Sequence, residues 1–391
     1  MKNLDGKLIV LAVTGSIAAV ETVKLAHELK RRGACVQAVM SDAATHLIHP
    51  DALTYACGRE TITRISGLVE HVTYCGDDHA ADLLLIAPAT ANTISKIAGG
   101  IDDTPVTTFA TTAIGSGVPI ILVPAMHYAM FRHPAVMENL ERMIGWGVTV
   151  VGPRIEEGKA KIADISDIVL HCEREMSEKP LLGQRVLITS GRCEEPVDDV
   201  RVLTTRSSGQ MGKELALAAF RLGADVTIIH RDDVRCVRNI RSDTAASMLE
   251  AVSREFAEKD VDLYMSAAAV SDYAPVRHPG KIPGGHPVTL DLRPLPKILD
   301  LAIPRAKVTV AFKVGEKSTE EAGILLEKGV ALVAANAPAV MGSSSGTYTL
   351  IDRTGMRALS GSKDEIADGI LRHLIADHHP GSRKANLQEQ G

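Results

Sequence analysis

The sequence predicts an α/β protein made of two doubly wound parallel-sheet domains, and two observations support this prediction. Short apolar runs alternate with amphipathic segments along both halves of the chain, a pattern typical of buried parallel strands separated by helices. The chain also has 391 residues, which exceeds one ordinary core, so we expect two domains of roughly 150 to 200 residues each.

In the first half, an amphipathic helix at 21–33 follows the first of four apolar runs. The runs are KLIVLAV (7–13), ACVQAVM (34–40), ADLLLIA (81–87) and VPIILVPAM (118–126). Each run is bounded by turn-forming residues, and the helix closes on Gly33, as helices in such units usually do. The alternation predicts a parallel sheet covered by helices.

The pattern restarts in the second half, where a helix at 212–223 also closes on a glycine, Gly223. The expected strands are QRVLITSG (184–191), ADVTIIH (224–230), VDLYMSAA (261–268), AKVTVAF (306–312) and GVALVAAN (329–336). A charged stretch followed by Pro180 and Gly183 separates the halves, so we place the boundary near Leu182. The expected domains are 1–182 and 183–378, and the polar, aperiodic segment 379–391 is expected to be a disordered tail.

Composition excludes several classes of protein. The chain is 45% hydrophobic and 23% charged with a formal net charge of -5, so we expect no basic surface for nucleic acid. Its six cysteines show neither paired spacing nor a zinc pattern, which favours a reduced, cytoplasmic setting. No apolar run approaches the roughly 20 residues of a membrane span, so we expect no membrane partner.

Two loops at the ends of predicted strands are candidate ligand sites. In TGSIAAVE (14–21) the strand breaks at Gly15 and a helix is expected from about Ser16, so backbone N–H groups and a hydroxyl would face an anion. The loop is not the GxGxxG of a dinucleotide fold, and a single phosphate, as in FMN, fits it better. PATANT (88–93) either contacts a flavin or carbonyl substrate, or is an ordinary helix cap by Thr90 or Asn92.

The stretch VPAMHYAM (123–130) begins as a buried strand and places His127 at its carboxyl end. Because parallel strands present functional residues at their carboxyl ends, His127 is either a site residue or simply a packed histidine.

At this point several ordered motifs resemble a known family. GSIAA, the EHV of 70–72, APATANTISKIAGGI and PAM with Met130 are similar to flavin-dependent phosphopantothenoylcysteine decarboxylases. In the second half, RSSGQMG, SAAAVSDY, GKI and VAAN resemble phosphopantothenate-cysteine ligase. The order covers nearly the whole chain and resembles the fused, archaeal-type enzyme of coenzyme A synthesis. The resemblance implies a flavodoxin-like flavoprotein domain followed by a Rossmann-like ligase domain.

For the first half, the resemblance implies a bound FMN that oxidises the substrate thiol, after which the neighbouring carboxylate leaves as carbon dioxide. Its expected contacts are Gly15, Ser16, Ile17, Ser41, Thr90, Ala91 and Asn92. His71 corresponds to the family's catalytic base. Met126 belongs to the substrate site, and His127 stands where the family has an asparagine that binds the substrate carboxylate.

The family's substrate-covering loop contains a cysteine that helps to protonate the enethiolate product. The corresponding GPRIEEGKAKIAD (152–164) has none, and Cys172 lies beyond it in an expected helix. Lys159 or Lys161 would donate the proton or neutralise the substrate phosphate, or both are simply solvated charges. The proton donor is therefore left open.

For the second half, the resemblance implies a CTP-dependent ligation of cysteine to 4'-phosphopantothenate through an acyl-cytidylate, with Mg²⁺ on the triphosphate. The expected nucleotide and substrate residues are Gly209, Met211, Gly212, Asp272, Lys281, Phe312 and Lys328. Lys281 is also expected to be catalytic. Thr205 stands where the family has the asparagine that processes the acyl-cytidylate, and Gln210 replaces a lysine. The resemblance further implies a homo-oligomer.

Three other interpretations remain open on the sequence. A nicotinamide oxidoreductase would share the doubly wound halves, but neither first turn carries GxGxxG. A non-catalytic flavoprotein would keep the fold and lose the chemistry, and the absent loop cysteine and Thr205 favour it. The third alternative is a protein that retains only one of the two activities. His71 and Lys281 favour a working enzyme.

Overall fold

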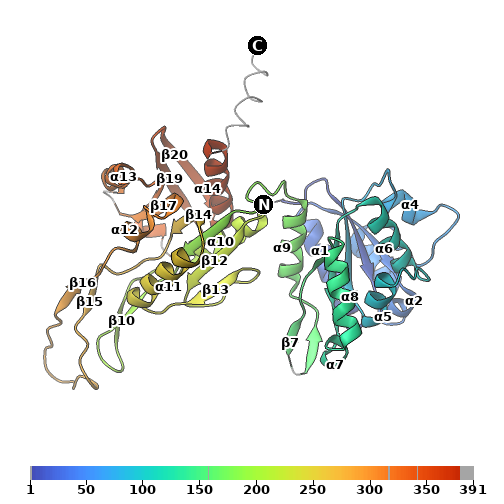
Figure 1. The fold of residues 1–391 in the computed structure, drawn as a ribbon, viewed down its shortest axis with the longest axis horizontal. Coiled ribbons are helices and arrows are strands. Elements are labelled where there is room, and N and C mark those ends of the chain that lie inside the picture. Colours follow the sequence, from blue (N-terminus) through green and yellow to red (C-terminus); the bar gives the residue numbers. More distant parts are fainter. Residues whose placement is uncertain (1, 157, 316–317, 341, 379–391) are drawn as a thin grey trace, which may run out of the picture. The chain divides into compact units, whose positions relative to one another are not determined.

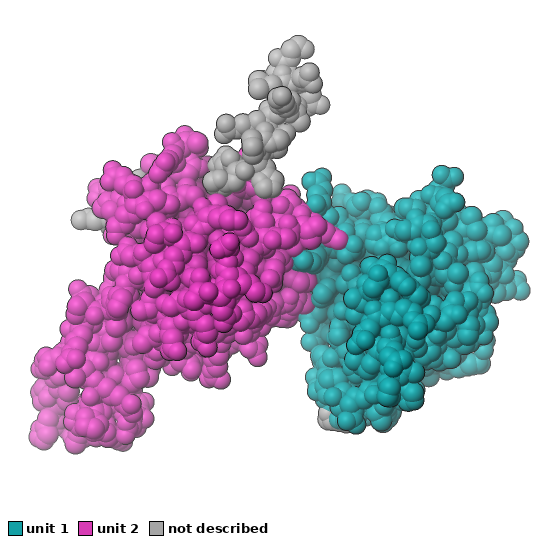
Figure 2. All heavy atoms as spheres, viewed as in Figure 1, with its two compact units in different colours: residues 1–178 teal, residues 179–391 magenta. Residues whose placement is uncertain are grey.

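The computed structural model describes residues 2–156, 158–315, 318–340 and 342–378. They form two compact units, 1–178 and 179–391, which Figure 2 colours separately. The division comes shortly before the expected boundary at Leu182 because the intervening residues pack on the second unit. The N–H of Leu181 donates to the carbonyl of Leu222 at 2.9 Å. The tail expected at 379–391 lies outside the described residues.

The first unit is built on a five-stranded sheet in the order β2-β1-β3-β4-β6, and every pairing in it is parallel. Its strands are β1 (Leu8–Val13), β2 (Cys35–Met40), β3 (Leu83–Ala89), β4 (Ile120–Pro124) and β6 (Thr149–Val150). A separate antiparallel sheet has the order β5-β8-β7, from β5 (Met126–His127), β7 (Arg154–Glu156) and β8 (Lys159–Lys161). The four strands predicted for this half are confirmed, whereas β6 and the β7–β8 hairpin were not predicted.

Helices cover both faces of this sheet (Figure 1). They are η1 (Ile17–Glu21), α1 (Thr22–Arg31), α2 (Asp42–Thr45), α3 (Pro50–Cys57), α4 (Glu70–Cys75), α5 (Ala91–Ala98), α6 (Pro105–Ser116), α7 (Tyr128–Phe131), α8 (Pro134–Gly145) and α9 (Ile165–Met176). Along β1, Ile9 packs in one core with α1, α3 and α9, and Val10 packs in the other with α5, α6 and α8. Burial on both faces explains why the strands read as continuous apolar runs.

The second unit contains an eight-stranded sheet in the order β13-β12-β9-β14-β17-β18-β19-β20. Its strands are β9 (Arg185–Thr189), β12 (Asp225–His230), β13 (Arg238–Arg241), β14 (Val261–Ser266), β17 (Ala306–Val314), β18 (Leu332–Asn336), β19 (Ser345–Asp352) and β20 (Gly355–Ser362). The sheet is parallel from β13 to β18, as predicted, and antiparallel at one edge, where β19 pairs with β18 and β20. Asp352 pairs with Gly355 across a tight turn, and a tight hairpin can join only antiparallel strands.

Helices also lie on both faces of the second sheet. They are α10 (Gln210–Arg221), α11 (Ala245–Glu258), α12 (Ile298–Ala302), α13 (Ser318–Glu327), η2 (Pro338–Val340) and α14 (Lys363–His378). In β9, Ile188 packs in the core with α10 and α14, whereas Leu187 packs with α11 and α12. Two short antiparallel pairs project from the sheet, one of β10 (Glu194–Pro196) and β11 (Val202–Thr204), the other of β15 (Tyr273–Pro275) and β16 (Leu292–Pro294).

The topology of each unit puts its connecting loops where sites are expected. The strand β9 lies between β12 and β14, so the chain order reverses at its carboxyl end, and such a switch point is the usual ligand crevice of an open sheet. Gly33 and Gly223 close the helices before β2 and β12 with φ of 100° and 99°, as predicted. Within the described residues, none of the helices has the length and apolar character needed to span a bilayer.

Candidate active sites

A cavity of about 640 Å³ lies in the first unit where the loops after β1, β3 and β4 meet. This volume is in the ordinary range for a bound cofactor or substrate. The predicted site residues that line it are Gly15, Ser16, Ile17, Thr90, Ala91, Met126 and His127. The fold therefore brings together three segments that are far apart in the sequence.

The turn after β1 has the close packing expected of a phosphate loop. A Cβ on Gly15 would lie 2.6 Å from the Cβ of Ala43, so no side chain fits there. The hydroxyl of Ser16 accepts a long hydrogen bond of 3.5 Å from the N–H of Ala18. The helix expected from Ser16 is first the short 3-10 helix η1, and α1 begins only at Thr22. Ser41 does not line the cavity, and its buried hydroxyl has no hydrogen-bond partner in the structure.

Thr90 combines the two interpretations considered for PATANT. Its hydroxyl caps α5 by accepting from the N–H of Thr93 at 3.3 Å, and its own N–H donates to the hydroxyl of Thr14 at 3.1 Å. The second contact ties the loop after β3 to the end of β1. Thr90 and Ala91 line the cavity, whereas the exposed side chain of Asn92 does not.

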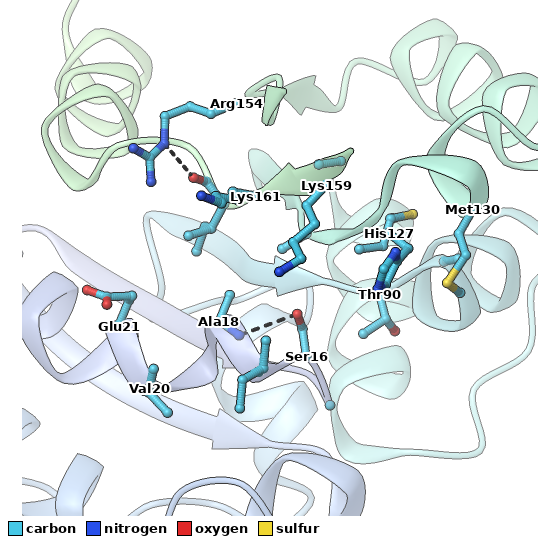
Figure 3. A pocket seen from close by; sticks show the side chains of 17 residues that line it. Ser16, Ala18, Val20, Glu21, Thr90, His127, Met130, Arg154, Lys159 and Lys161 are labelled. Atoms are coloured by element: carbon cyan, nitrogen blue, oxygen red, sulfur yellow. Dashed lines mark hydrogen bonds between the residues drawn. The ribbon is translucent and has the colours of Figure 1, made fainter. Parts of the chain in front are cut away.

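The β7–β8 hairpin forms one wall of the cavity and brings Arg154, Lys159 and Lys161 to it (Figure 3). Lys161 pairs with Glu156 at 3.0 Å, and Arg154 pairs with Asp164 at 3.2 Å. The sequence prediction missed Arg154. Its position in the same charged loop as the two lysines was the available signal, but charge alone does not show which side chains turn inward.

His127 is exposed and lines the cavity, so the interpretation of a packed histidine is wrong. It precedes α7 without capping it. His71 lies instead on α4 and does not line the cavity, and its buried Nδ1 has no hydrogen-bond partner in the structure. One copy of the chain therefore does not bring the two predicted histidines together.

In the second unit, a glycine cradle lies at the carboxyl end of β9. Gly209 precedes α10 with φ of 72°, a conformation that favours glycine, and a Cβ on it would come within 3.0 Å of the Cα of Gly191. Gly212 packs so closely against Ser190 that a Cβ on it would lie 2.1 Å from the Ser190 hydroxyl oxygen. That hydroxyl donates to the carbonyl of Gly209 at 3.1 Å. Met211 is buried in the core beneath. The start of α10 is thus a candidate anion site, where the N–H groups of Gly209 and Gln210 make only long hydrogen bonds, to the hydroxyls of Ser207 (3.3 Å) and Ser208 (3.4 Å).

Thr205 lies beside the same edge, where its hydroxyl donates to the carbonyl of Ala269 at 3.4 Å. Ala269 in turn donates its N–H to the carbonyl of Gly191 at 2.8 Å. Asp272 follows a few residues later and pairs with Lys297. The loops after β9 and β14 and the segment before α10 therefore meet at the switch point.

Three other predicted residues lie apart from this cradle. Lys281 is exposed between β15 and β16, next to Ile282, whose carbonyl accepts from Arg201 at 3.2 Å. Phe312 is half-buried in β17 with its ring 6.5 Å from that of Tyr348. Lys328 follows α13 and pairs with Asp300 of α12 at 2.9 Å. Because both helix ends precede the strands β17 and β18, Lys328 is near the amino edge of the sheet.

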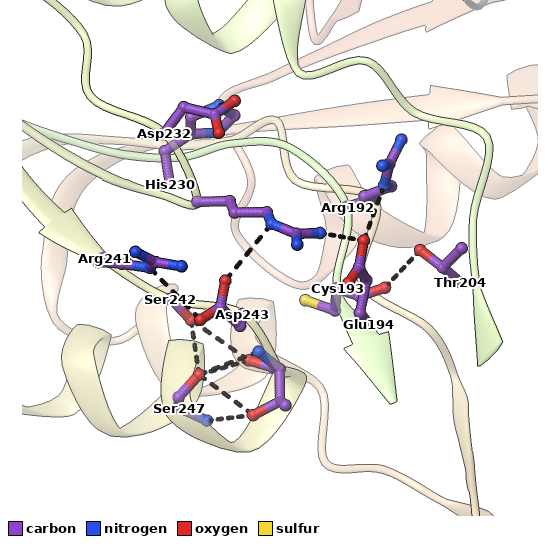
Figure 4. Close-up of polar contacts among 12 residues, drawn as sticks. Arg192, Cys193, Glu194, Thr204, His230, Asp232, Arg241, Ser242, Asp243 and Ser247 are labelled. Carbon is purple, nitrogen blue, oxygen red and sulfur yellow. Dashed lines mark hydrogen bonds and ion pairs between the residues drawn. The ribbon is translucent and has the colours of Figure 1, made fainter. Parts of the chain in front are cut away.

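Figure 4 shows a polar cluster beside the cradle that the sequence did not reveal. Glu194 contacts both Arg192 and Arg231, and Arg231 lies 3.6 Å from Asp243. His230 ends β12 beside Gly191 and Gly209, and burial lowers its pKa. Parallel strands present functional residues at their carboxyl ends, and this rule drew attention to His127. It applied equally to His230, so it was the signal that the sequence prediction missed.

Comparison with known proteins assigns a family to each half of the chain. Residues 1–176 match the Flavoprotein family, and residues 181–377 match the DNA/pantothenate metabolism flavoprotein C-terminal domain. The coenzyme A biosynthesis bifunctional protein CoaBC of Thermococcus kodakarensis is 44% identical over 94% of this chain and 95% of its own. The chain belongs to the CoaBC family. The CoaBC protein of Methanocaldococcus jannaschii is 35% identical over 95% of this chain and 94% of its own.

Membership of the CoaBC family confirms the function expected from the motifs. The protein is a bifunctional enzyme of coenzyme A biosynthesis, with a flavoprotein decarboxylase half followed by a ligase half. The alternatives of a nicotinamide oxidoreductase and of a non-catalytic flavoprotein are not supported by this result. Among the described residues, no group of three or more histidine, cysteine or acidic side chains is arranged to hold a metal ion.

Proposed function

We propose that the second unit joins 4'-phosphopantothenate to cysteine with CTP, and that the first unit decarboxylates the product to 4'-phosphopantetheine with FMN. The observation that carries the proposal is the cavity in which Ser16, Thr90 and His127 meet on a flavoprotein fold. The substrates of a CoaBC enzyme are small molecules, so no nucleic acid or membrane partner is required, and a cytoplasmic setting remains part of the proposal.

The residues present fit an FMN. The Gly15 turn leaves no space for a side chain. Ser41 directly follows β2, and its N–H donates to the carbonyl of Val13 at the end of β1. Its hydroxyl is buried and has no partner among the described residues. Ser16 and the Gly15 backbone would hold the flavin phosphate, and Thr90 and Ala91 would border the rest of the cofactor. Bound FMN would supply the oxidation of the substrate thiol that activates the adjacent carboxylate for loss.

His127 would bind that carboxylate. It is the exposed hydrogen-bond donor at the end of β5, facing the cavity next to Met126. An imidazole N–H donates to a carboxylate oxygen in the neutral form, and more strongly when protonated.

His71 would act in the cavity of a second copy of the chain. Exposed apolar side chains flank it (Leu68, Val69 and Val72), and others rim the cavity (Ile17, Val20 and Met130). One exposed apolar surface lies beside His71 and the other lies around the cavity that needs a histidine. Exposed apolar surfaces of this kind favour an interface between copies of the chain. We therefore propose a homo-oligomer in which each cavity receives a histidine from its neighbour.

In the second unit, the N–H groups of Gly209 and Gln210 would exchange their long hydrogen bonds to the hydroxyls of Ser207 and Ser208 for the CTP phosphates, with Mg²⁺ accompanying the nucleotide. Thr205 would contact the acyl-cytidylate, since its hydroxyl lies at the loop edge that meets Gly191 through Ala269. Asp272 and Phe312 would contact the nucleotide. Lys281 would neutralise the triphosphate if the arm between β15 and β16 brings it to the cradle, and Lys328 would do so from another copy of the chain.

The central test supplies the full chain with 4'-phosphopantothenate, cysteine, CTP and Mg²⁺ and follows the products by mass spectrometry. We expect 4'-phosphopantothenoylcysteine and then 4'-phosphopantetheine, and a yellow protein with flavin absorbance. Accumulation of the first product alone would mean that only the ligase is active. No ligation, together with decarboxylation of supplied 4'-phosphopantothenoylcysteine, would leave only the first unit active.

The shared site is tested by mixing subunits. A His71→Asn protein is expected to release no carbon dioxide, and a His127→Leu protein is expected to release little at a substrate concentration well below its raised KM. After they are dissociated and reassembled together, some cavities would combine an intact His127 with an intact His71 from the neighbour, and activity should return. A monomer by light scattering, or no recovery in mixed oligomers, would contradict the shared cavity.

A further inference from the structure

Lys159 lies directly opposite His127 in the wall of the cavity. The antiparallel pairing of β5 with β8 sets Met126 against Ala160 and His127 against Lys159. Residues directly opposite each other on such strands project their side chains to the same face. Figure 3 shows the ammonium group of Lys159 reaching from the hairpin toward the middle of the cavity.

Lys159 also differs from its neighbours in its charge environment. Lys161 pairs with Glu156 at 3.0 Å, and Glu21, which also lines the cavity, lies 3.4 Å from the ammonium of Lys24. The side chain of Lys159 makes no hydrogen bond or ion pair with any residue in the described part of the chain. Its proton is therefore free to be given to a ligand.

Decarboxylation requires such a proton. When the bond to the carboxylate breaks and carbon dioxide leaves, an electron pair remains on the carbon that carried it. If His127 holds the carboxylate, the donor must reach that carbon from a facing position. None of the cysteines lines the cavity, and the hairpin positions Ala160 and Ile162 carry no transferable proton.

We propose that Lys159 is the catalytic acid that protonates the carbon from which carbon dioxide leaves, an inference that rests on the decarboxylase function proposed above. The electron pair of the broken carbon–carbon bond, held as an enethiolate, takes a proton from Nζ. The lysine is left as a neutral amine and regains its proton from water. The proton transfer neither oxidises nor reduces the substrate and leaves a thioaldehyde; the saturated thiol then needs the two electrons that bound FMN would have taken from the substrate thiol.

The test follows a single turnover of the full chain with FMN, in excess over 4'-phosphopantothenoylcysteine, and measures carbon dioxide and thiol product separately. Lys159→Met removes the proton and keeps the length of the side chain. Lys159→Arg keeps the charge, but a guanidinium does not release its proton. Lys7→Met is the matched control, because Lys7 pairs with Asp82 at 2.9 Å and does not line the cavity. Flavin absorbance and substrate affinity are measured for each variant.

In Lys159→Met and Lys159→Arg we expect flavin and substrate binding within a few-fold of the original. Carbon dioxide release should persist, but the unsaturated enethiol should accumulate, and the saturated thiol should form about 100-fold more slowly or worse, the usual effect of a lost general acid. Lys7→Met should form the saturated thiol normally.

Formation of saturated thiol at the original rate by Lys159→Met would overturn the assignment. So would full activity of Lys159→Arg, which would show that only the charge matters. Equal loss of carbon dioxide release and of saturated thiol would mean that Lys159 acts in a step before the proton transfer. That result would also overturn the assignment of Lys159 as the acid. Absence of carbon dioxide release from the unaltered protein would contradict the proposed decarboxylase function instead.

Discussion

A Cβ atom on Gly212 would lie 2.1 Å from the hydroxyl oxygen of Ser190 and 2.4 Å from its Cβ. The first turn of α10 therefore touches the end of β9 at a point where only glycine fits. This contact holds the segment before α10 over the switch point of the second sheet. It connects one sequence position to the geometry of the candidate nucleotide site.

Gly212→Ala should push α10 away from β9 and break the bond from the Ser190 hydroxyl to the Gly209 carbonyl. We expect a loss of about 1 to 3 kcal/mol in stability of the second unit, typical of overpacking, and loss of ligation. Decarboxylation of supplied 4'-phosphopantothenoylcysteine should continue. Gly323→Ala in α13 is the control, because nothing lies within 4 Å of its added Cβ. Normal ligation by Gly212→Ala would show that the close contact is not needed.

His127→Asn should retain decarboxylation, since an amide N–H can still donate to the carboxylate. His127→Leu should raise KM about tenfold or more, because a desolvated carboxylate without its donor costs about 1 to 3 kcal/mol. His133→Asn is the control: His133 caps α8 by accepting from the N–H of Ala135 at 3.2 Å and does not line the cavity. An unchanged KM in His127→Leu would show that His127 lines the cavity without binding the substrate carboxylate. Steady-state kinetics of carbon dioxide release gives the answer.

Glu255 is a fully buried carboxylate held between two arginines, Arg185 at 2.5 Å and Arg238 at 2.7 Å. Glu255→Gln removes the negative charge and leaves the largely buried guanidinium of Arg185 uncompensated. We expect the free energy of unfolding of the second unit to fall by about 3 to 5 kcal/mol, the usual cost of breaking a buried pair. Urea denaturation measures this loss. Glu258→Gln, an exposed position on the same helix, should change it little.

Burial lowers the pKa of His171 in α9 from 6.5 to about 4, with a further contribution from the nearby charge of Arg174. The folded state therefore resists protonation that the unfolded state accepts. The stability contributed by the neutral ring is complete above pH 6.5 and is lost as the pH falls from 6.5 toward 4. The full loss amounts to up to about 3 kcal/mol.

Denaturation of the full chain at several pH values tests this linkage through the transition of the first unit. His171→Gln should show less loss of stability between neutral and acidic pH than the unaltered protein. His46→Gln is the control, since that ring is well exposed on α2. An identical pH profile in His171→Gln would mean that other groups cause the acid sensitivity.

The sequence by itself determined the strands and the turns that follow them. Continuous apolar runs predicted β1, β3, β9 and β12 because a strand buried on both faces needs apolar side chains at every position. Gly15 and Gly209 marked the loops where a backbone approaches another chain segment too closely for a side chain. The order of these local signals was sufficient to identify the family and both halves of the enzyme.

Only the tertiary structure decided which side chains share a cavity. The register that sets His127 opposite Lys159 depends on pairing β5 with a hairpin about thirty residues later in the chain, and nothing local to either residue specifies it. The structure likewise set His71 outside the cavity of its own copy and Lys328 beside Asp300. Long-range packing of whole elements fixes these distances, and the periodicity of one segment carries no information about the position of another.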